Sequence, residues 1–283
     1  MALTPQEEAR IALSAAGQLP EAEIDLAATA LQFARIDAPE ADWHAAAAVI
    51  SELAQEAVAA AGADREAEAG DADRRRKALA GIIHERLGFA GDAETYDDLA
   101  NANLIRVLER RRGLPVALGI LWLHAAEAAS WAAHGVDFPG HFLVAVEGVR
   151  NQALVDVFAG GNGLQAPDLR VLLKRMEGER AELRPGVLRL LGKRGVLLRL
   201  QNNIKLRRLR AGDLPGALAC TEDMLRLCPD HATLWREAGL MNQRLERIAA
   251  ALNCFDRSLE LEPMGEAASR IRALAEELRH RLH

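Results

Sequence analysis

The sequence predicts an α+β fold that is mostly helical and that ends in a helical repeat. Half of the 283 residues are hydrophobic and only 4% are aromatic. Alanine and leucine, which favour helices, are abundant. Strand-like runs occur only between residues 141 and 160. Further along, Ala217 and Ala251 are 34 residues apart, and so are Pro229 and Pro263, which indicates a repeated unit.

The composition is typical of a soluble globular protein of about two domains. The net charge of −6 argues against a surface built for nucleic acid. The chain has no run of about 18 apolar residues, and its first residues, MALTPQEEARIAL, lack the pattern of an export signal. An odd number of cysteines in no framework spacing favours a reduced, cytoplasmic location: Cys220, Cys228 and Cys254. The histidines show no metal-ligand spacing, so we expect neither metal nor cofactor.

The pattern of the first ninety residues predicts helices joined by short polar segments. Apolar positions at helical spacing predict helices over residues 5–17 and 21–36, followed by an alanine-rich helix over about 42–61. The charged segment 62–76 is expected to be a loop that leads into a helix over about 75–87.

The middle of the chain predicts one buried helix and a small sheet. A short helix over 103–112 ends at Gly113, and Pro115 suits the first turn of the next helix. That helix, over 116–133, is apolar on nearly all sides and is therefore expected to be buried. Two strand-like runs, 141–149 and 153–160, follow with a turn between them and predict an antiparallel pair.

From about Gly186 onward we expect helices alone, which divides the chain into domains 1–185 and 186–283. The second repeat unit carries five residues at the spacing of the tetratricopeptide pattern: Trp235, Gly239, Ala251, Phe255 and Pro263. The first unit is degenerate, with Lys205 at the small-residue position and Thr221 at the aromatic position. Two units bury little by themselves, so we expect them to dock on the first domain as one body.

Several blocks of the sequence resemble a bacterial family. Tyr96 and Asn101 come first, followed by VLERRRGLPVAL (107–118), FPGHFLV (138–144) and LVDVFAGG (154–161). In this order they resemble the Sir-B-type family, whose members join a transglutaminase-like domain to tetratricopeptide repeats. The resemblance covers about residues 75–265, and Val157 departs from the proline usual there. The matching motif residues are Asn101, Glu109, Arg110, Gly113, Pro115, Pro139 and Gly140.

The resemblance implies a papain-like or transglutaminase-like fold with a small antiparallel sheet. In such enzymes a cysteine at a helix start attacks an acyl carbon, a histidine acts as base and an aspartate orients it. His141 and Asp156 match the last two roles, and a hairpin can bring them together across 15 residues. The nucleophile is missing, because no cysteine precedes Cys220 and residues 111–121 (RRGLPVALGIL) hold no serine or threonine.

Two functions remain open at this point, and a third class, a nucleic-acid-linked regulator, rests only on the basic stretch 184–210 and on the naming of the family. The sequence favours a non-catalytic protein-binding or scaffolding protein, and the alternative is a hydrolase or transferase that uses His141 and Asp156 without a covalent intermediate. In the first case the pair serves to pin two strands together. An open, polar cleft that reaches His141 favours the enzyme, whereas a cleft near Pro115 that is filled by apolar side chains favours the scaffold.

Two basic stretches offer further candidate sites. Arg110, Arg111 and Arg112 precede a helix start, where an anion is stabilised, but Glu109 offers an internal partner. Residues 184–210 hold nine lysines or arginines and no acid. They form either a docking stripe for an acidic protein or a solvated face that the acidic remainder neutralises. The partner-binding candidates are Asn202, Asn203, Lys205 and Arg208, and neither nucleic acid nor a membrane is expected to bind.

Overall fold

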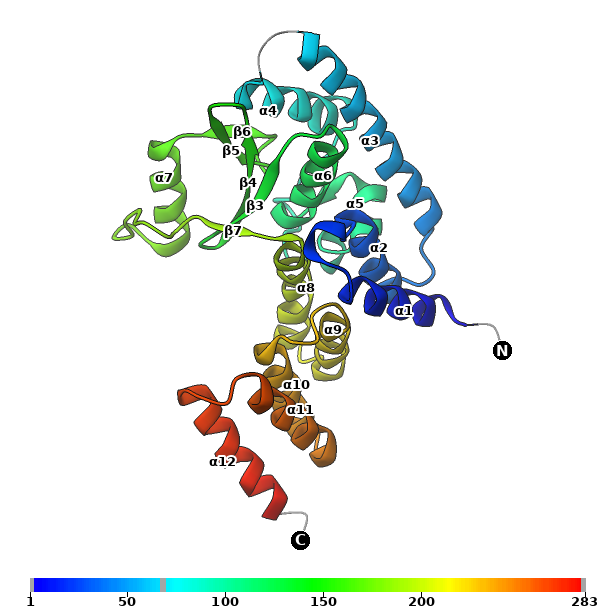
Figure 1. Cartoon of the computed structure of the whole chain (residues 1–283), viewed down its shortest axis with the longest axis vertical. Helices are drawn as coiled ribbons and strands as arrows, with labels where there is room; N and C mark the ends of the chain where they lie inside the picture. The colour runs from blue at the N-terminus through cyan, green and yellow to red at the C-terminus, as the bar shows by residue number, and fades with distance from the viewer. Residues whose placement is uncertain (1–2, 67–69, 281–283) are drawn as a thin grey trace. The chain divides into compact units, whose positions relative to one another are not determined.

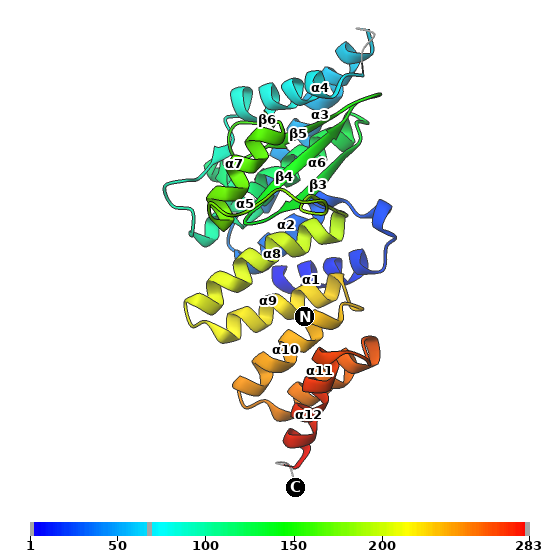
Figure 2. The same ribbon diagram turned by 90° about the vertical axis from the view of Figure 1, so that its left-hand side faces the viewer.

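The computed structural model describes residues 3–66 and 70–280, which form two compact units (Figures 1 and 2). The first unit contains the residues up to Ala9 together with Pro20–Leu200, and the second contains Arg10–Leu19 together with the residues from Gln201 on. Helices α1 (Pro5–Gly17) and α8 (Lys193–Arg210) therefore contribute residues to both units. The predicted domain boundary at residue 186 and the predicted docking of the repeats both stay predictions.

The helices of the first unit, apart from the unpredicted α7, begin close to where the sequence predicts them. They are α2 (Leu26–Asp37), α3 (Trp43–Glu66), α4 (Ala72–Ala80), α5 (Leu104–Arg110), α6 (Pro115–Ala128) and α7 (Ala166–Glu177). Asp25, Asp71 and Asn103 cap three of them, since each side chain accepts a hydrogen bond from a backbone N–H of the first turn. Among the described residues, no helix is both long and apolar enough to cross a membrane.

Three helix boundaries differ from the prediction. The expected helix 21–36 is a short 3-10 turn, Glu21–Glu23, followed by α2. The expected loop 62–76 is wrong at both ends, because α3 continues through Gly62 to Glu66 and α4 begins at Ala72. Its residues 67–69 lie outside the described part. The expected helix 116–133 ends earlier, at Ala128, and Ser130 adopts a left-handed backbone (φ 57°) that terminates it.

The described residues include a five-stranded antiparallel sheet with the order β6-β5-β4-β3-β7. The predicted pair corresponds to β4 (His141–Glu147) and β5 (Gln152–Asp156). The sequence did not predict helix α7 or the other three strands of this sheet. These strands are β3 (Ala133–Phe138), β6 (Asn162–Leu164) and β7 (Arg189–Leu191). A parallel pair, β1 (Ala90–Gly91) and β2 (Arg112–Gly113), lies apart from this sheet.

Helices cover both faces of the sheet. Helix α6 lies so close to β4 that a Cβ at Gly119 would come within 2.2 Å of the Phe142 ring. On the opposite face, residues of β3 and β4 pack on the leucines of α7, in a cluster of Val136, Phe138, Leu143, Ala145, Leu169, Leu172 and Leu173. Because side chains alternate along a strand, β4 presents Phe142 to one helix and Leu143 to the other. Helix α6 is buried, as its apolar sequence predicts.

Trp122 of α6 is fully buried and is anchored by a histidine. A π-helix, Gly81–Arg86, continues α4 and carries His84. The His84 Nδ1 atom lies 2.7 Å from the Phe89 carbonyl oxygen, and the Trp122 indole N–H donates to His84 Nε2 at 3.1 Å. Both contacts require a neutral imidazole with its proton on Nδ1. Burial lowers the pKa of His84, which agrees with this assignment.

The second unit is a helical repeat, as predicted. It contains α9 (Leu214–Leu227), α10 (Ala232–Arg244), α11 (Ile248–Leu261) and α12 (Glu266–His280). Gly239 has to be small, because a Cβ there would lie 2.4 Å from the Phe255 ring. The Trp235 indole N–H donates to the Pro229 carbonyl at 2.7 Å. In the degenerate unit, Lys205 replaces this close packing by an ion pair with Glu237 of α10.

We predict that Phe255→Ala lowers the free energy of unfolding by about 3–5 kcal/mol, because it leaves a cavity at the centre of the repeat. Phe255 is fully buried and packs with α12 residues such as Ile271 and Leu278. Urea unfolding followed by tryptophan fluorescence measures the change. Met264→Ala is the control, since Met264 is 85% exposed. Equal losses in both variants would show that the repeat has no such core.

We predict that the first unit loses stability as the pH falls below about 6.5, the ordinary pKa of His84. The unfolded chain then binds a proton at His84 that the folded chain resists, so the free energy of unfolding rises with pH in this range. Protonation would also set two donors, Nε2–H and the Trp122 N–H, against each other. Urea unfolding between pH 5 and 8 should show a smaller pH slope for His84→Gln. The same slope in both proteins would contradict this assignment.

Candidate functional site

His141 and Asp156 form a hydrogen-bonded pair at one end of the neighbouring strands β4 and β5. A turn at Pro139 and Gly140 joins β3 to β4, and Gly140 takes a left-handed backbone (φ 67°) that favours glycine. His141 is the first residue of β4, and Asp156 is the last residue of β5. His141 Nε2 lies 3.1 Å from Asp156 Oδ1, which confirms the predicted reach. The predicted orientation of the imidazole toward Pro115 stays a prediction.

The carboxylate of Asp156 is ionised and accepts several hydrogen bonds. Burial by itself would raise the pKa of Asp156, but the hydrogen bond and charge of His141 lower it, and so do the N–H groups of Ala159 and Phe158. These two N–H groups donate to Oδ1 at 3.2 and 3.0 Å. The net effect is a lowered pKa. An ionised carboxylate only accepts hydrogen bonds, so His141 Nε2 carries a proton and donates it.

The aromatic ring of Phe158 adjoins the His141 imidazole, which is only 7% exposed. The Phe158 ring meets it edge-on with centroids 6.3 Å apart, and Tyr96 meets Phe158 edge-on at 5.9 Å. Phe158 also lies against β1, because a Cβ at Gly91 would come within 2.4 Å of its ring. Sequence reasoning missed Phe158, although it stands two residues after Asp156 in the block LVDVFAGG.

The start of α6, where the resemblance places a nucleophile, is apolar and buried. Leu114, Val116 and Ala117 are each at most 2% exposed, and Pro115 is buried. The three cysteines are buried in the second unit at Cys220, Cys228 and Cys254. Burial raises the pKa of the Cys254 thiol, so it disfavours the reactive thiolate.

The motif residues Asn101 and Arg110 hold the segment before α5 in place. Asn101 is fully buried and donates from Nδ2 to the Thr95 carbonyl at 2.6 Å. Arg110 donates to Asp92 at 3.1 Å and also pairs with Asp98. The hydroxyl and N–H of Thr95, with help from Arg110, lower the pKa of Asp92 to about 2 despite its burial. Arg110 thus acts in an internal network instead of an anion site.

The neighbouring motif residues have local roles. Glu109 accepts a hydrogen bond from Arg106 at 2.9 Å. The sequence suggested Glu109 as a partner for the arginines at 110–112 instead. A Cβ at Gly113 would lie 2.9 Å from Val107, which explains the glycine. The Leu114 N–H then donates to the Asn101 carbonyl and ties the start of α6 to the same segment.

The basic stretch 184–210 is largely neutralised within the protein. Its ion pairs are Arg184–Glu182, Arg189–Asp137, Lys193–Glu127, Arg194–Glu21, Arg199–Asp137, Lys205–Glu237 and Arg208–Asp213. This pattern agrees with the reading of a face that the acidic remainder of the chain balances. The expectation that nucleic acid does not bind stays a prediction.

Three of the four partner-binding candidates are engaged internally. The side chain of Lys205 is 6% exposed and pairs with Glu237. Arg208 donates to the Gly216 carbonyl at 3.1 Å. Asn203 accepts a hydrogen bond from Arg207, and Asn202 is half-buried. The role of all four in partner binding stays a prediction.

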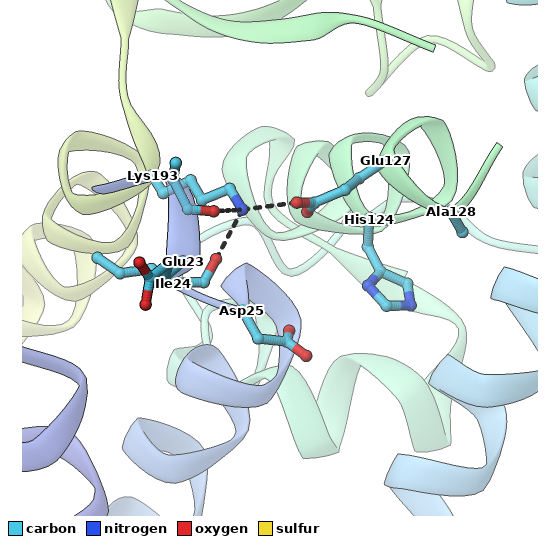
Figure 3. A pocket seen from close by; sticks show the side chains of 8 residues that line it. Glu23, Ile24, Asp25, His124, Glu127, Ala128 and Lys193 are labelled. Carbon is cyan, nitrogen blue, oxygen red and sulfur yellow. Dashed lines mark hydrogen bonds and ion pairs between the residues drawn. The ribbon is translucent and has the colours of Figure 1, made fainter. Parts of the chain in front are cut away.

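A pocket of about 290 Å³ lies elsewhere in the first unit (Figure 3), and its lining includes neither His141 nor Asp156. Lys193 crosses one side of it and donates from Nζ to Glu127 and to the Ile24 carbonyl, both at 2.7 Å. These contacts join the segment before α2 to the last turn of α6. In the described ranges, no three His, Cys, Asp or Glu side chains gather as metal ligands would.

Comparisons with known proteins match both parts of the chain. A model of the transglutaminase-like superfamily matches residues 44–202, and a tetratricopeptide-repeat model matches residues 204–276. This order confirms the predicted one, while the narrower Sir-B-type name stays a resemblance. A UPF0162 protein of Xylella fastidiosa strain Temecula1 is 30% identical over 184 residues, 64% of this chain and 66% of that protein. The chain thus spans slightly less than two thirds of that relative.

A second relative and one solved structure are also similar to this chain. A UPF0162 protein of Vibrio cholerae is 28% identical over 210 residues, which are 74% of this chain and 78% of that protein. A crystal structure of menin covers 90% of this chain and 70% of menin, at 11% identity and a TM-score of 0.43. That score is too low to support an argument about this protein.

We predict that Gly91→Ala displaces the Phe158 ring from His141 and destabilises the first unit, because the new methyl group overlaps the ring. The proton resonances of the His141 imidazole report the change, since they lose the ring-current shift of Phe158. Gly62→Ala is the matched control, because a Cβ there meets nothing within 4 Å. Unchanged His141 resonances in Gly91→Ala would refute this packing.

Proposed function

Because the chain belongs to the transglutaminase-like superfamily but carries buried apolar residues where a nucleophile is needed, we propose that it is a non-catalytic protein-binding or scaffolding protein. The observation that carries this proposal is the start of α6, where Leu114, Pro115, Val116 and Ala117 form part of the core. None of these side chains can attack an acyl carbon. The transglutaminase-like unit then serves as a folded body for recognition, together with the repeats. A cytoplasmic location is part of the proposal.

The setting of the His141–Asp156 pair supports a structural role. The backbone pairing between β4 and β5 runs from Glu147–Gln152 to Val144–Val155 and stops there. The side-chain bond joins the same strands beyond that point, where His141 and Asp156 have no backbone pairing with each other. Asp156 Oδ1 accepts two further bonds from the following turn. Removing one partner of such a half-buried hydrogen-bonded pair is destabilising, because the other partner is left without its hydrogen bond.

The second candidate is a hydrolase or transferase that works without a covalent intermediate. One observation favours it: Asp156 fixes the proton of His141 on Nε2, which leaves Nδ1 free to accept a proton from water or a hydroxyl. The low exposure of the imidazole and the rings of Phe158 and Tyr96 speak against substrate access. This candidate requires movement of these rings.

We predict that the purified chain shows no transamidase, peptidase or esterase turnover. We also predict that thiol alkylation leaves its binding to a protein partner unchanged. Acyl-donor peptides and activated esters serve as substrates, and mass spectrometry detects any covalent acyl adduct. A protein partner captured from the native cell should bind His141→Gln as strongly as it binds the unchanged chain. Turnover that His141→Gln abolishes, or an adduct on any residue, would reject the proposal in favour of an enzyme.

A further inference from the structure

The pocket beside Lys193 is built from three segments of the first unit (Figure 3). Residues 22–25, which precede α2, line one part of it. His124, Glu127 and Ala128 line another, because residues three and four apart share one face of α6. Lys193 is the first residue of α8. The volume of about 290 Å³ lies near the lower end of the range of small-molecule sites, so the pocket suits a small ligand.

The ammonium group of Lys193 has no donor left for a ligand. Such a group carries three N–H donors and no acceptor. The Lys193 Nζ atom has three acceptors, which are Glu127 Oε1 and the Ile24 carbonyl at 2.7 Å and the Ala22 carbonyl at 3.3 Å. Its charge is also paired with that of Glu127. A ligand that carries a carboxylate or a phosphate would therefore find no free lysine in this pocket.

The other polar side chains of the pocket offer acceptors. Glu23 and Asp25 are exposed, and among the residues that the structure describes neither carboxylate has an ion-pair partner. Asp25 uses Oδ1 to accept the Ala28 N–H at 2.9 Å. His124 Nε2 lies 3.3 Å from the Ile50 carbonyl oxygen and has to donate there, since a carbonyl only accepts. Nδ1 of the neutral His124 ring is then an acceptor.

The charge of the pocket is negative. Glu23, Asp25 and Glu127 bring three carboxylates, and Lys193 brings one ammonium group that Glu127 already pairs. A concave surface with an excess of one charge attracts ligands of the opposite charge. In the described ranges, no three His, Cys, Asp or Glu side chains converge on one point as metal ligands would. The arrangement thus suits a cation that binds through N–H groups.

We infer that this pocket binds the ammonium group of a small organic amine. The N–H donors of the amine meet the carboxylates of Glu23 and Asp25, which form charge-assisted hydrogen bonds with it. Its alkyl chain lies against Ala22 and Ala128 of the lining. The inference is independent of the proposed protein-binding function, because it depends on a different part of the first unit.

Calorimetric titration of the full-length chain with cadaverine, a five-carbon diamine, tests the inference. Cadaverine should bind and should raise the Tm as its concentration increases, since a ligand of the folded state stabilises it. The imidazole resonances of His124 should shift during the titration. Pentanediol, which has the same chain without charge, and glutarate, which has the opposite charge, should not compete. Binding of cadaverine should weaken as salt is added.

A charge-removing variant, Glu23→Gln/Asp25→Asn, should bind cadaverine about tenfold or more weakly. Asparagine caps a helix as well as aspartate does, so α2 keeps its first turn. The matched control is Glu94→Gln/Asp42→Asn, which removes the same two charges outside the pocket. Asp42 accepts the Ala45 N–H at 3.0 Å, as a cap of α3. The control should bind like the unchanged chain, and circular dichroism should show that both variants are folded.

Equal binding of cadaverine by the two double variants would overturn the inference. So would binding of glutarate in place of cadaverine, or the absence of both heat and a Tm shift with every amine. A lysine derivative with blocked backbone groups is the second amine. If it binds more tightly than cadaverine, the ammonium group comes from a lysine side chain. Failure of the inference would leave the proposed function intact, since that proposal rests on the first turn of α6.

Discussion

The structure of the first unit depends on the close contact between α6 and β4. Gly119 has no side chain, so the Phe142 ring lies directly against the helix, and α6 is buried from Pro115 to Trp122. A helical segment in this position has to be apolar, including its first turn. The same contact turns Phe142 to one face of β4 and Leu143 to the other, where α7 covers it. Core packing thus decides which chemistry the first turn of α6 can offer.

Core packing also determines the chemistry that is available near His141. In a cysteine enzyme, the first turn of the helix, the histidine and the aspartate act as one unit. Here the first turn of α6 belongs to the core, while His141 and Asp156 remain bonded beside Phe158. Asn101 and Arg110 fix the neighbouring segment through Thr95 and Asp92. These residues all have partners within the first unit, which supports the proposed structural role.

The sequence predicted what local patterns determine and missed what long-range pairing determines. Helical periodicity located most helices, and the 34-residue offset located the repeats. Strands β3 and β7 were missed because β3 contains His134, Gly135 and Asp137, which show no clear alternation, and β7 has only three residues; both form by pairing with distant segments. The reach of His141 to Asp156 was predictable because a hairpin joins them. Phe158 was not, since only the fold brings it to Gly91.

The central claim is that His141 and Asp156 stabilise the fold instead of performing a reaction. A double-mutant cycle on the free energy of unfolding tests it most directly, using His141→Gln, Asp156→Asn and the double variant. The account predicts that both single variants are destabilised and that their coupling energy is about 0.5–3 kcal/mol, as for residues that share a hydrogen bond. Variants as stable as the unchanged chain, with no coupling, would contradict it, because residues kept for catalysis often cost stability.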